Sequence, residues 1–226
     1  MKEKIKILLV EDHQIVRKGL KAFLELEDDM LILAEAEDGL EAVKLCKSLN
    51  PMVIVMDIAL PKLNGMEATR QIIKVNPHSK ILMLSAYADD GYIKKVIDLG
   101  VSGYLIKQCA PDFLIQAIRE IHKGNKFFSP DLLERFTFLN NKKMNQEGVS
   151  QKKTQLLSER ESQVLQMIAE GNANKEIAYQ LKISIKTVEK HRQNLMQKLS
   201  IHDTAGLTRY AISEGVIENS SQKTIL

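Results

Sequence analysis

The chain has 226 residues, of which 44% are hydrophobic and 27% are charged, and its formal net charge at pH 7 is +3. This is the composition of an ordinary folded protein, and it excludes collagen, intrinsic disorder and disulfide-rich miniproteins. The longest apolar runs fall far short of the roughly 18 residues that a membrane helix needs, so no membrane span is expected.

The N-terminus lacks the apolar core and small-residue cleavage site of a signal peptide, so we expect the protein to stay in the cytoplasm. The two cysteines, Cys46 and Cys109, have no second Cys or His nearby at ligand spacing. We therefore predict that both are buried thiols and that neither belongs to a disulfide or a zinc site.

Charge is distributed unevenly along the chain. Residues 1–124 carry 17 Lys and Arg against 18 Asp and Glu, whereas residues 125–226 carry 15 against 11. Residues 140–155 contain only two large apolar residues, which predicts a flexible linker, and Ser129 and Pro130 ahead of it are typical of a short helix start. The predicted parts are a first domain at 1–124, a linker with a short helix at 125–153, a second domain at 154–218 and a polar tail at 219–226.

Five short apolar runs recur in the first domain and are separated by segments of helical periodicity. The runs are residues 5–10, 31–34, 52–56, 81–84 and 103–106. Strands that alternate with helices in this way predict a parallel sheet with helices on both faces. Ligands of such sheets bind beyond the carboxyl ends of the strands.

Reactive polar residues stand at the ends of four of these runs. They are Glu11 and Asp12, Asp57, Ser85 and Lys107. Because the ends of parallel strands share one edge, these residues are expected to converge, and three gathered carboxylates repel one another unless a cation joins them. Carboxylate oxygens with room for water suit Mg²⁺, which would also favour phosphoryl transfer to a carboxylate. Lys107 and Ser85 are placed to bind phosphoryl oxygens.

The stretches around these residues resemble the receiver domains of two-component response regulators. They are LLVEDH, VMDIALPKLNG, LMLSAY and GYLIK, in that order. The resemblance covers residues 4–123 and implies a doubly wound, flavodoxin-like α/β fold whose five-stranded parallel sheet has the order 2-1-3-4-5. It further implies that Asp57 is phosphorylated and that Glu11, Asp12, Asp57 and the backbone carbonyl of Ala59 bind Mg²⁺.

The same resemblance implies a switch. Ser85 and Tyr104 would reorient when the acceptor is modified, while Lys107 holds the phosphoryl group. One residue departs from the family pattern: many receivers have proline after the lysine, whereas Gln108 stands here, so a cis Lys-Pro bond is impossible. Each residue taken alone has a plainer interpretation, as a strand end, a turn cap or a solvated charge, and the ordered set favours the site.

The second domain carries clear helix boundaries. Ser158 and Glu161 form a predicted capping box, and Asn174 is a predicted cap for a second helix. Residues 182–184 then make a three-residue turn, and Ser184 is expected to cap a third helix. Such a short connection between two helices is typical of a helix-turn-helix.

The third helix divides into two faces. Val188, Leu195 and Leu199 are expected to face inward. The polar residues expected to face outward are Lys186, Glu189, Lys190 and Gln193. Residues 174–200 carry six basic and two acidic side chains, a balance that favours a polyanion. A solvated face on a small bundle explains the charge equally well, but not the tight turn.

The sequence LSERESQVLQMIAEGNANKEIAYQLKISIKTVEKHRQNLMQKL resembles the LuxR-type helix-turn-helix, and with this receiver the whole chain is similar to a NarL/FixJ-type response regulator. The resemblance implies a small all-α four-helix domain. It gives Glu189, Lys190 and Gln193 as base-edge contacts and Lys175, Ser184, Thr187 and Arg192 as phosphate-contact candidates. Residues 203–214 would pair two such domains on DNA, although Leu207 and Tyr210 in this segment equally fit a core.

The predicted function is transcriptional regulation. A sensor histidine kinase would phosphorylate Asp57 with Mg²⁺, and the protein would bind double-stranded promoter DNA as a homodimer and contact RNA polymerase. We expect no enzyme activity beyond its own phosphorylation and dephosphorylation. The alternatives are a regulator that binds DNA without phosphorylation, a Mg²⁺-dependent phosphatase or phosphotransferase acting through Asp57, and a small-molecule sensor. The small-molecule sensor is disfavoured because the short strands suggest no apolar ligand pocket.

Overall fold

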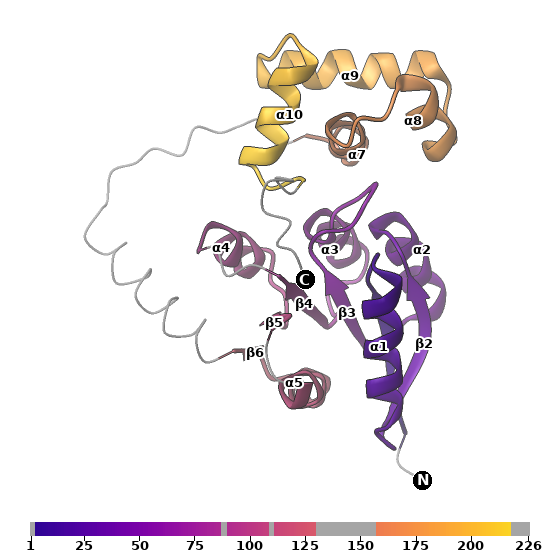
Figure 1. Cartoon of the computed structure of the whole chain (residues 1–226), viewed down its shortest axis with the longest axis vertical. Helices are drawn as coiled ribbons and strands as arrows, with labels where there is room; N and C mark the ends of the chain where they lie inside the picture. The colour runs from indigo at the N-terminus through magenta and orange to yellow at the C-terminus, as the bar shows by residue number, and fades with distance from the viewer. Residues whose placement is uncertain (1–2, 87–89, 109–110, 130–156, 218–226) are drawn as a thin grey trace, which may run out of the picture. The chain divides into compact units, whose positions relative to one another are not determined.

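The computed structural model describes residues 3–86, 90–108, 111–129 and 157–217 (Figure 1). The chain divides into two compact units: the first comprises residues 1–60 and 65–150, and the second comprises residues 61–64 and 151–226. The first unit is an α/β structure and the second is helical.

A parallel sheet forms the centre of the first unit. Its strands are β1 (Ile5–Val10), β2 (Met30–Ala36), β3 (Val53–Asp57), β4 (Ile81–Ser85), β5 (Gly103–Ile106) and β6 (Phe127–Phe128). Their order is β2-β1-β3-β4-β5-β6, and every neighbouring pair is parallel. The predicted doubly wound sheet and the order of its first five strands are confirmed.

The sixth strand was not predicted, because two residues are too short to show an alternating pattern. Phe127 pairs with Gly103 at the edge of the sheet. A β-carbon at position 103 would lie 2.5 Å from the carbonyl oxygen of Phe127, so only glycine allows this close approach. β6 therefore adds to the sheet residues that were predicted to belong to the linker.

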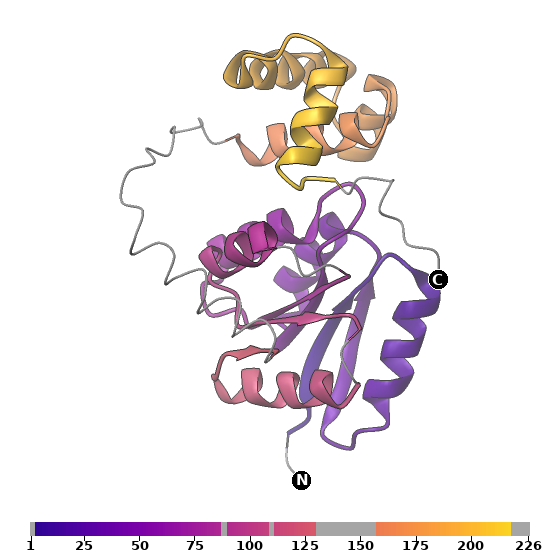
Figure 2. The ribbon, with the colours of Figure 1, turned by 60° about the vertical axis from the view of Figure 1, so that its left-hand side comes forward.

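Helices cover both faces of the sheet (Figures 1 and 2). One face is covered by α1 (Gln14–Glu25) and α5 (Pro111–Lys123), whose apolar residues share one hydrophobic core with strand residues. The other face is covered by α2 (Gly39–Leu49), α3 (Gly65–Val75) and α4 (Asp90–Asp98).

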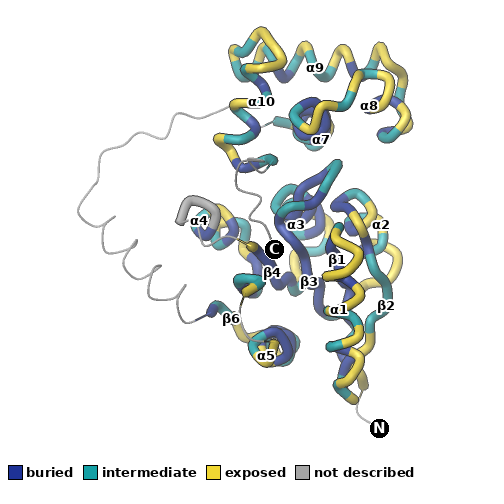
Figure 3. Tube along the Cα trace, in the orientation of Figure 1, coloured by how far each residue is buried: buried dark blue, intermediate teal, exposed yellow. Residues whose placement is uncertain are grey.

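Burial follows this layering. All residues of β3 and β4 are buried, whereas the edge strand β2 is mostly half-buried (Figure 3). A strand covered on both faces is a continuous apolar run, which is why the sequence showed runs rather than alternation. Cys46 on α2 is buried and free, as predicted, whereas Cys109 lies outside the described residues.

The second unit contains α7 (Glu159–Ala169), α8 (Asn174–Leu181), α9 (Ile185–Leu199) and α10 (Thr204–Ser213). The capping box of Ser158 and Glu161 is confirmed, and the hydroxyl of Ser184 accepts from the backbone N–H of Thr187. Residues 182–184 form the predicted three-residue turn between α8 and α9.

The predicted cap of α8 is wrong by one residue. Ala173 is the capping residue and Asn174 is the first helical residue. The backbone N–H of Ala173 donates to a carboxylate oxygen of Glu176 at 2.7 Å. Because the glutamate satisfies this donor, the helix begins without a polar cap residue, and the side chain of Asn174 is left for another contact.

Two predicted segments cannot be compared with the structure. The short helix expected after Ser129 and the linker at 140–155 lie outside the described residues. Within the ranges that are described, no helix has the length and apolar character to cross a membrane.

Candidate functional sites

Acidic and basic side chains converge at the carboxyl edge of the sheet in the first unit. Glu11 follows β1, Asp57 ends β3 and Lys107 follows β5. The ammonium nitrogen of Lys107 lies 2.8 Å from Oδ2 of Asp57 and 2.8 Å from Oε2 of Glu11. The structure thus brings together residues that are up to 96 positions apart in the sequence.

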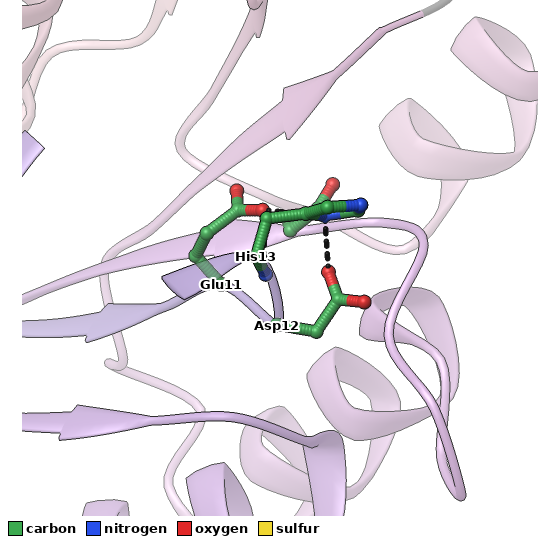
Figure 4. A group of neighbouring side chains, drawn as sticks. Glu11, Asp12 and His13 are labelled. Atoms are coloured by element: carbon green, nitrogen blue, oxygen red, sulfur yellow. Dashed lines mark hydrogen bonds and ion pairs between the residues drawn. The ribbon is translucent and has the colours of Figure 1, made fainter. Parts of the chain in front are cut away.

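Asp12 and His13 also belong to this cluster. The carboxylates of Glu11, Asp12 and Asp57 and the imidazole of His13 offer ligand atoms that all lie within 4.8 Å of one another. Figure 4 shows the ring of His13 next to the carboxylates of Glu11 and Asp12. Its Nδ1 lies 3.1 Å from Oε1 of Glu11 and 2.9 Å from Oδ1 of Asp12. The cluster is therefore a set of oxygen donors with one nitrogen donor at its rim.

His13 was not among the residues predicted for this site. It stands at the capping position of α1 and is exposed, but its side chain makes no capping hydrogen bond. The sequence signal that could have placed His13 in the cluster is its position directly after the acidic pair Glu11 and Asp12 at the end of a strand.

Burial controls the electrostatics of this cluster. Asp57 is only 2% exposed, and its burial, reinforced by the neighbouring charge of Glu11, raises its pKa to about 6 against the opposing effect of Lys107. Burial also disfavours the charged ammonium of Lys107, but the two carboxylates outweigh this and raise its pKa. Three carboxylates, those of Glu11, Asp12 and Asp57, gather around one ammonium, so the donor set fits a further cation.

The resemblance gave Ala59 a backbone role. The N–H of Ala59 donates to Oδ1 of Asp57 at 3.3 Å, so this residue lies beside the carboxylate of Asp57. Receiver domains generally bind Mg²⁺ at such an acidic pocket, and oxygen ligands of this kind suit that ion. The acidic cluster is present here.

The predicted switch residues lie on the two neighbouring strands. Ser85 ends β4 and is buried, and its carbonyl oxygen accepts from the backbone N–H of Lys107 at 2.7 Å. Tyr104 lies on β5 and is fully buried. Ser85 ends its strand at the same edge of the sheet as the cluster, and the reorientation of Ser85 and Tyr104 remains a prediction.

Gly65, which begins α3, is a structural requirement of the site that the residue-by-residue prediction did not include. Its backbone N–H donates to the carbonyl oxygen of Ile58 at 2.9 Å, which closes the loop after β3. A β-carbon at position 65 would lie 1.9 Å from the carbonyl oxygen of Asp57. The available signal was the glycine at the end of VMDIALPKLNG.

An apolar cavity of about 320 Å³ lies between α1 and α5. Its lining includes Leu20 and Phe23 on α1, Leu114 on α5 and, at one side, Lys107. The premise that short strands leave no apolar pocket was therefore wrong. The walls of this cavity come largely from the two helices, so its size does not depend on the length of the strands.

The second unit presents the predicted division of α9. Val188 and Leu195 are buried, and Leu199 is half-buried. The residues predicted to face outward are all exposed: Lys186, Glu189, Lys190 and Gln193. The helix therefore offers a polar face on the side away from its core, as a recognition helix requires.

Three of the four phosphate-contact candidates make hydrogen bonds within the unit, and the fourth is exposed. The hydroxyls of Ser184 and Thr187 lie 2.8 Å apart at the start of α9. The guanidinium of Arg192 donates to Oδ1 of Asn174 and to the hydroxyl of Thr204. Lys175 is exposed in the first turn of α8. Arg192 thus links three helices, and its role toward DNA remains a prediction.

The last helix contributes two residues to the core of the second unit. Leu207 and Ala211 of α10 are fully buried, whereas Tyr210 is half-buried. The alternative that Leu207 is a core residue is confirmed, so its side chain does not form a pairing surface.

Two family models match the chain. Residues 7–119 match the response regulator receiver domain, and residues 155–211 match the luxR family of bacterial regulatory proteins. The chain belongs to the two-component response regulators of NarL/FixJ type. Members of this family are transcriptional regulators with a receiver domain and a LuxR-type DNA-binding domain.

Relatives and solved structures agree with this membership. The chain is 36% identical to the transcriptional regulatory protein DegU of Brevibacillus brevis, over 95% of this chain and 96% of that protein. It is similar to RcsB of Salmonella enterica serovar Typhimurium bound to promoter rprA with the phosphomimetic BeF3-, at 26% identity and TM-score 0.54, over 92% and 98% of the two chains. A structure of two RcsB dimers bound to two parallel DNAs gives 26% identity and TM-score 0.58, over 94% and 100%.

Proposed function

We propose that Asp57 is the phosphoacceptor of this response regulator and that a sensor histidine kinase supplies the phosphoryl group. Asp57 ends a buried strand with its carboxylate 2.8 Å from the ammonium of Lys107. The observation that carries the proposal is this meeting of Asp57, Lys107 and the acidic pair Glu11 and Asp12 at one strand edge.

The chemistry follows from the charges. A carboxylate oxygen of Asp57 attacks the phosphorus of the phosphodonor, the bond from phosphorus to the donor group breaks, and an acyl phosphate forms. Lys107 then pairs with a phosphoryl oxygen, and the hydroxyl of Ser85 donates to another. Mg²⁺ held by Glu11, Asp12, Asp57 and the carbonyl of Ala59 would neutralise the charge of the incoming group.

The modified receiver is proposed to favour a state that binds promoter DNA as a homodimer. A doubly charged phosphoryl group adds new hydrogen bonds and ion pairs at the strand edge, which is how such modifications bias a two-state element. Inverting a 1:99 equilibrium needs about 5.5 kcal/mol of differential stabilisation. The structures of RcsB on promoter DNA and as dimers on DNA support this model by analogy.

The second unit is proposed to read DNA with the outward face of α9. Glu189, Lys190 and Gln193 would contact base edges in the major groove. The phosphate contacts would come from Lys175, Ser184, Lys186, Thr187 and Arg192. Contact of the bound dimer with RNA polymerase completes the proposed activity.

Incubation with Mg²⁺ and a small acyl phosphate, followed by intact mass measurement, tests the acceptor. We expect one phosphoryl increment in the wild type and none in Asp57→Asn. The same increment in Asp57→Asn would overturn the assignment. Release of inorganic phosphate from added phosphate esters, measured in parallel, would instead support the phosphatase alternative.

Selection of bound fragments from genomic DNA, with and without acyl phosphate, tests the switch. We expect phosphorylation to increase the yield of specific fragments in the wild type but not in Asp57→Asn. Equal yields in all four samples would support a regulator that binds DNA without phosphorylation.

A further inference from the structure

Arg17 on α1 is a buried cation that the proposed reaction does not use. Its side chain is only 7% exposed. One terminal nitrogen of the guanidinium donates to the carbonyl oxygen of Glu11 at 2.7 Å and lies 3.4 Å from that of Asp12. The side chain therefore binds the backbone of the two acidic residues, not their carboxylates.

Two glutamates fix the other side of this guanidinium. Its second terminal nitrogen donates to Oε1 of Glu37 at 2.6 Å, and Nε lies 3.4 Å from Oε2 of Glu35. Glu35 belongs to β2 and Glu37 directly follows it. The planar fork of Arg17 thus joins the turn after β1 to the end of the neighbouring strand.

We propose that Arg17 is a positioning residue for the divalent cation site. This inference rests on the proposed function, because that site is part of it. The turn from β1 to α1 carries both Glu11 and Asp12, so the direction of their carboxylates depends on the backbone that Arg17 holds. Groups that orient metal ligands from behind influence metal affinity without touching the ion.

The geometry distinguishes arginine from lysine at this position. An ammonium is a single point charge, whereas the three nitrogens of the guanidinium lie near two carbonyl oxygens and two carboxylates at once. Lys21 provides a matched control on the same helix. Its ammonium nitrogen lies 2.7 Å from Oε1 of Glu35, and none of its contacts described in the structure reaches the turn.

The test measures Mn²⁺ binding to the full chain by electron paramagnetic resonance of the free ion, alongside thermal melts. We expect Arg17→Met to weaken Mn²⁺ binding about tenfold, Arg17→Lys to give an intermediate loss, and Lys21→Met to stay within about twofold of the wild type. In phosphorylation assays, the Mg²⁺ concentration for half-maximal rate should rise in Arg17→Met while the rate at saturating Mg²⁺ stays near the wild-type value.

Wild-type Mn²⁺ affinity in a folded Arg17→Met would overturn the inference, and so would an equal loss in Lys21→Met. If Arg17→Met does not fold, Arg17→Lys and Glu37→Gln provide the test instead. Unchanged Mn²⁺ affinity in both variants would overturn the inference. Failure of the wild type itself to bind Mn²⁺ would count against the proposed metal site and so separates the two hypotheses.

Discussion

Gly65 lies so close to Asp57 that a β-carbon at position 65 would be 1.9 Å from the carbonyl oxygen of the aspartate. The backbones of the first residue of α3 and the last residue of β3 therefore lie too close together to leave room for a side chain at position 65. Gly65→Ala must push the two elements apart at the proposed acceptor. We expect the substitution to destabilise the first unit by about 1–3 kcal/mol and to lower the yield of phosphorylation.

Gly19→Ala is the matched control, because a β-carbon at position 19 would meet no atom within 4 Å. Gly19 lies inside α1, where alanine is favoured over glycine by about 0.5–1 kcal/mol. The two glycine substitutions should thus shift thermal unfolding of the full chain in opposite directions. Shifts of the same sign would contradict the close approach at Gly65.

Removal of the ammonium of Lys107 leaves the buried carboxylates of Asp57 and Glu11 without this partner. We expect Lys107→Met to destabilise the first unit by about 1–2 kcal/mol in the absence of Mg²⁺, allowing for the partial exposure of the ammonium. Added Mg²⁺ should restore more stability to Lys107→Met than to the wild type, because the ion replaces the lost charge. Melting curves with and without Mg²⁺ measure this difference.

Lys123→Met serves as the comparison for that experiment. Lys123 is exposed on α5 and pairs with Glu120. Its removal should change stability little, and Mg²⁺ should have the same effect on it as on the wild type. An equal response to Mg²⁺ in all three proteins would show that Lys107 and the ion do not occupy one electrostatic site.

The carboxylate of Glu161 makes the second unit sensitive to acid. Burial alone would raise the pKa of the Glu161 carboxyl. Two hydrogen bonds outweigh this effect and hold the pKa below its usual range: one from Lys198 at 2.6 Å and one from the backbone N–H of Ser158 at 2.7 Å. A group whose pKa is lower in the folded state stabilises the fold above its unfolded pKa of about 4.3.

This stability is lost as the pH falls through the lower folded pKa. Glu161→Gln removes it, so the variant should be less stable than the wild type by about 1–2 kcal/mol at pH 7, and the difference should shrink in acid. Hydrogen exchange of α7 amides in the full chain, followed between pH 7 and pH 3, measures it. A difference that does not change with pH would assign the effect to packing.

DNA contacts can be separated by their salt dependence. If Lys175 meets a phosphate, Lys175→Ala should weaken binding to all sequences alike and reduce the slope of log affinity against log salt by about 1. If Gln193 meets a base edge, Gln193→Ala should keep the slope and relax preference at one base pair, at a cost of about 1–3 kcal/mol. Binding isotherms at several salt concentrations distinguish these results.

Lys123→Ala, an exposed lysine of the first unit, controls for the change in net charge. It should leave both slope and preference unchanged. A reduced slope in this variant as well would mean that total charge, rather than a contact of Lys175, sets the salt dependence.

The strands and the acidic edge were predictable because their signals are local. Each buried run ends in a polar residue, and parallel topology brings those ends together without knowledge of any contact. The faces of α9 followed from helical periodicity in the same way. Ser184 was predictable as a cap because its hydroxyl acts three residues along the chain.

The remaining features depend on contacts between distant segments. The hydrogen bonds of Arg17 join residues up to 20 positions apart and give no periodic signal. β6 exists because Phe127 finds Gly103 beside it. Asn174 was assigned as a cap by residue type, whereas the reach of Glu176 decided where the helix begins. The cavity between α1 and α5 likewise results from packing.

Lys107 borders that cavity and also contacts the proposed acceptor. If a molecule in the cavity binds more tightly to one conformation of this lysine, its binding is thermodynamically coupled to the phosphorylation of Asp57. The linkage is reciprocal: the factor by which filling the cavity alters the phosphorylation equilibrium equals the factor by which phosphorylation alters affinity for the occupant. An apolar space between two helices can thus influence the phosphorylation equilibrium through one shared side chain.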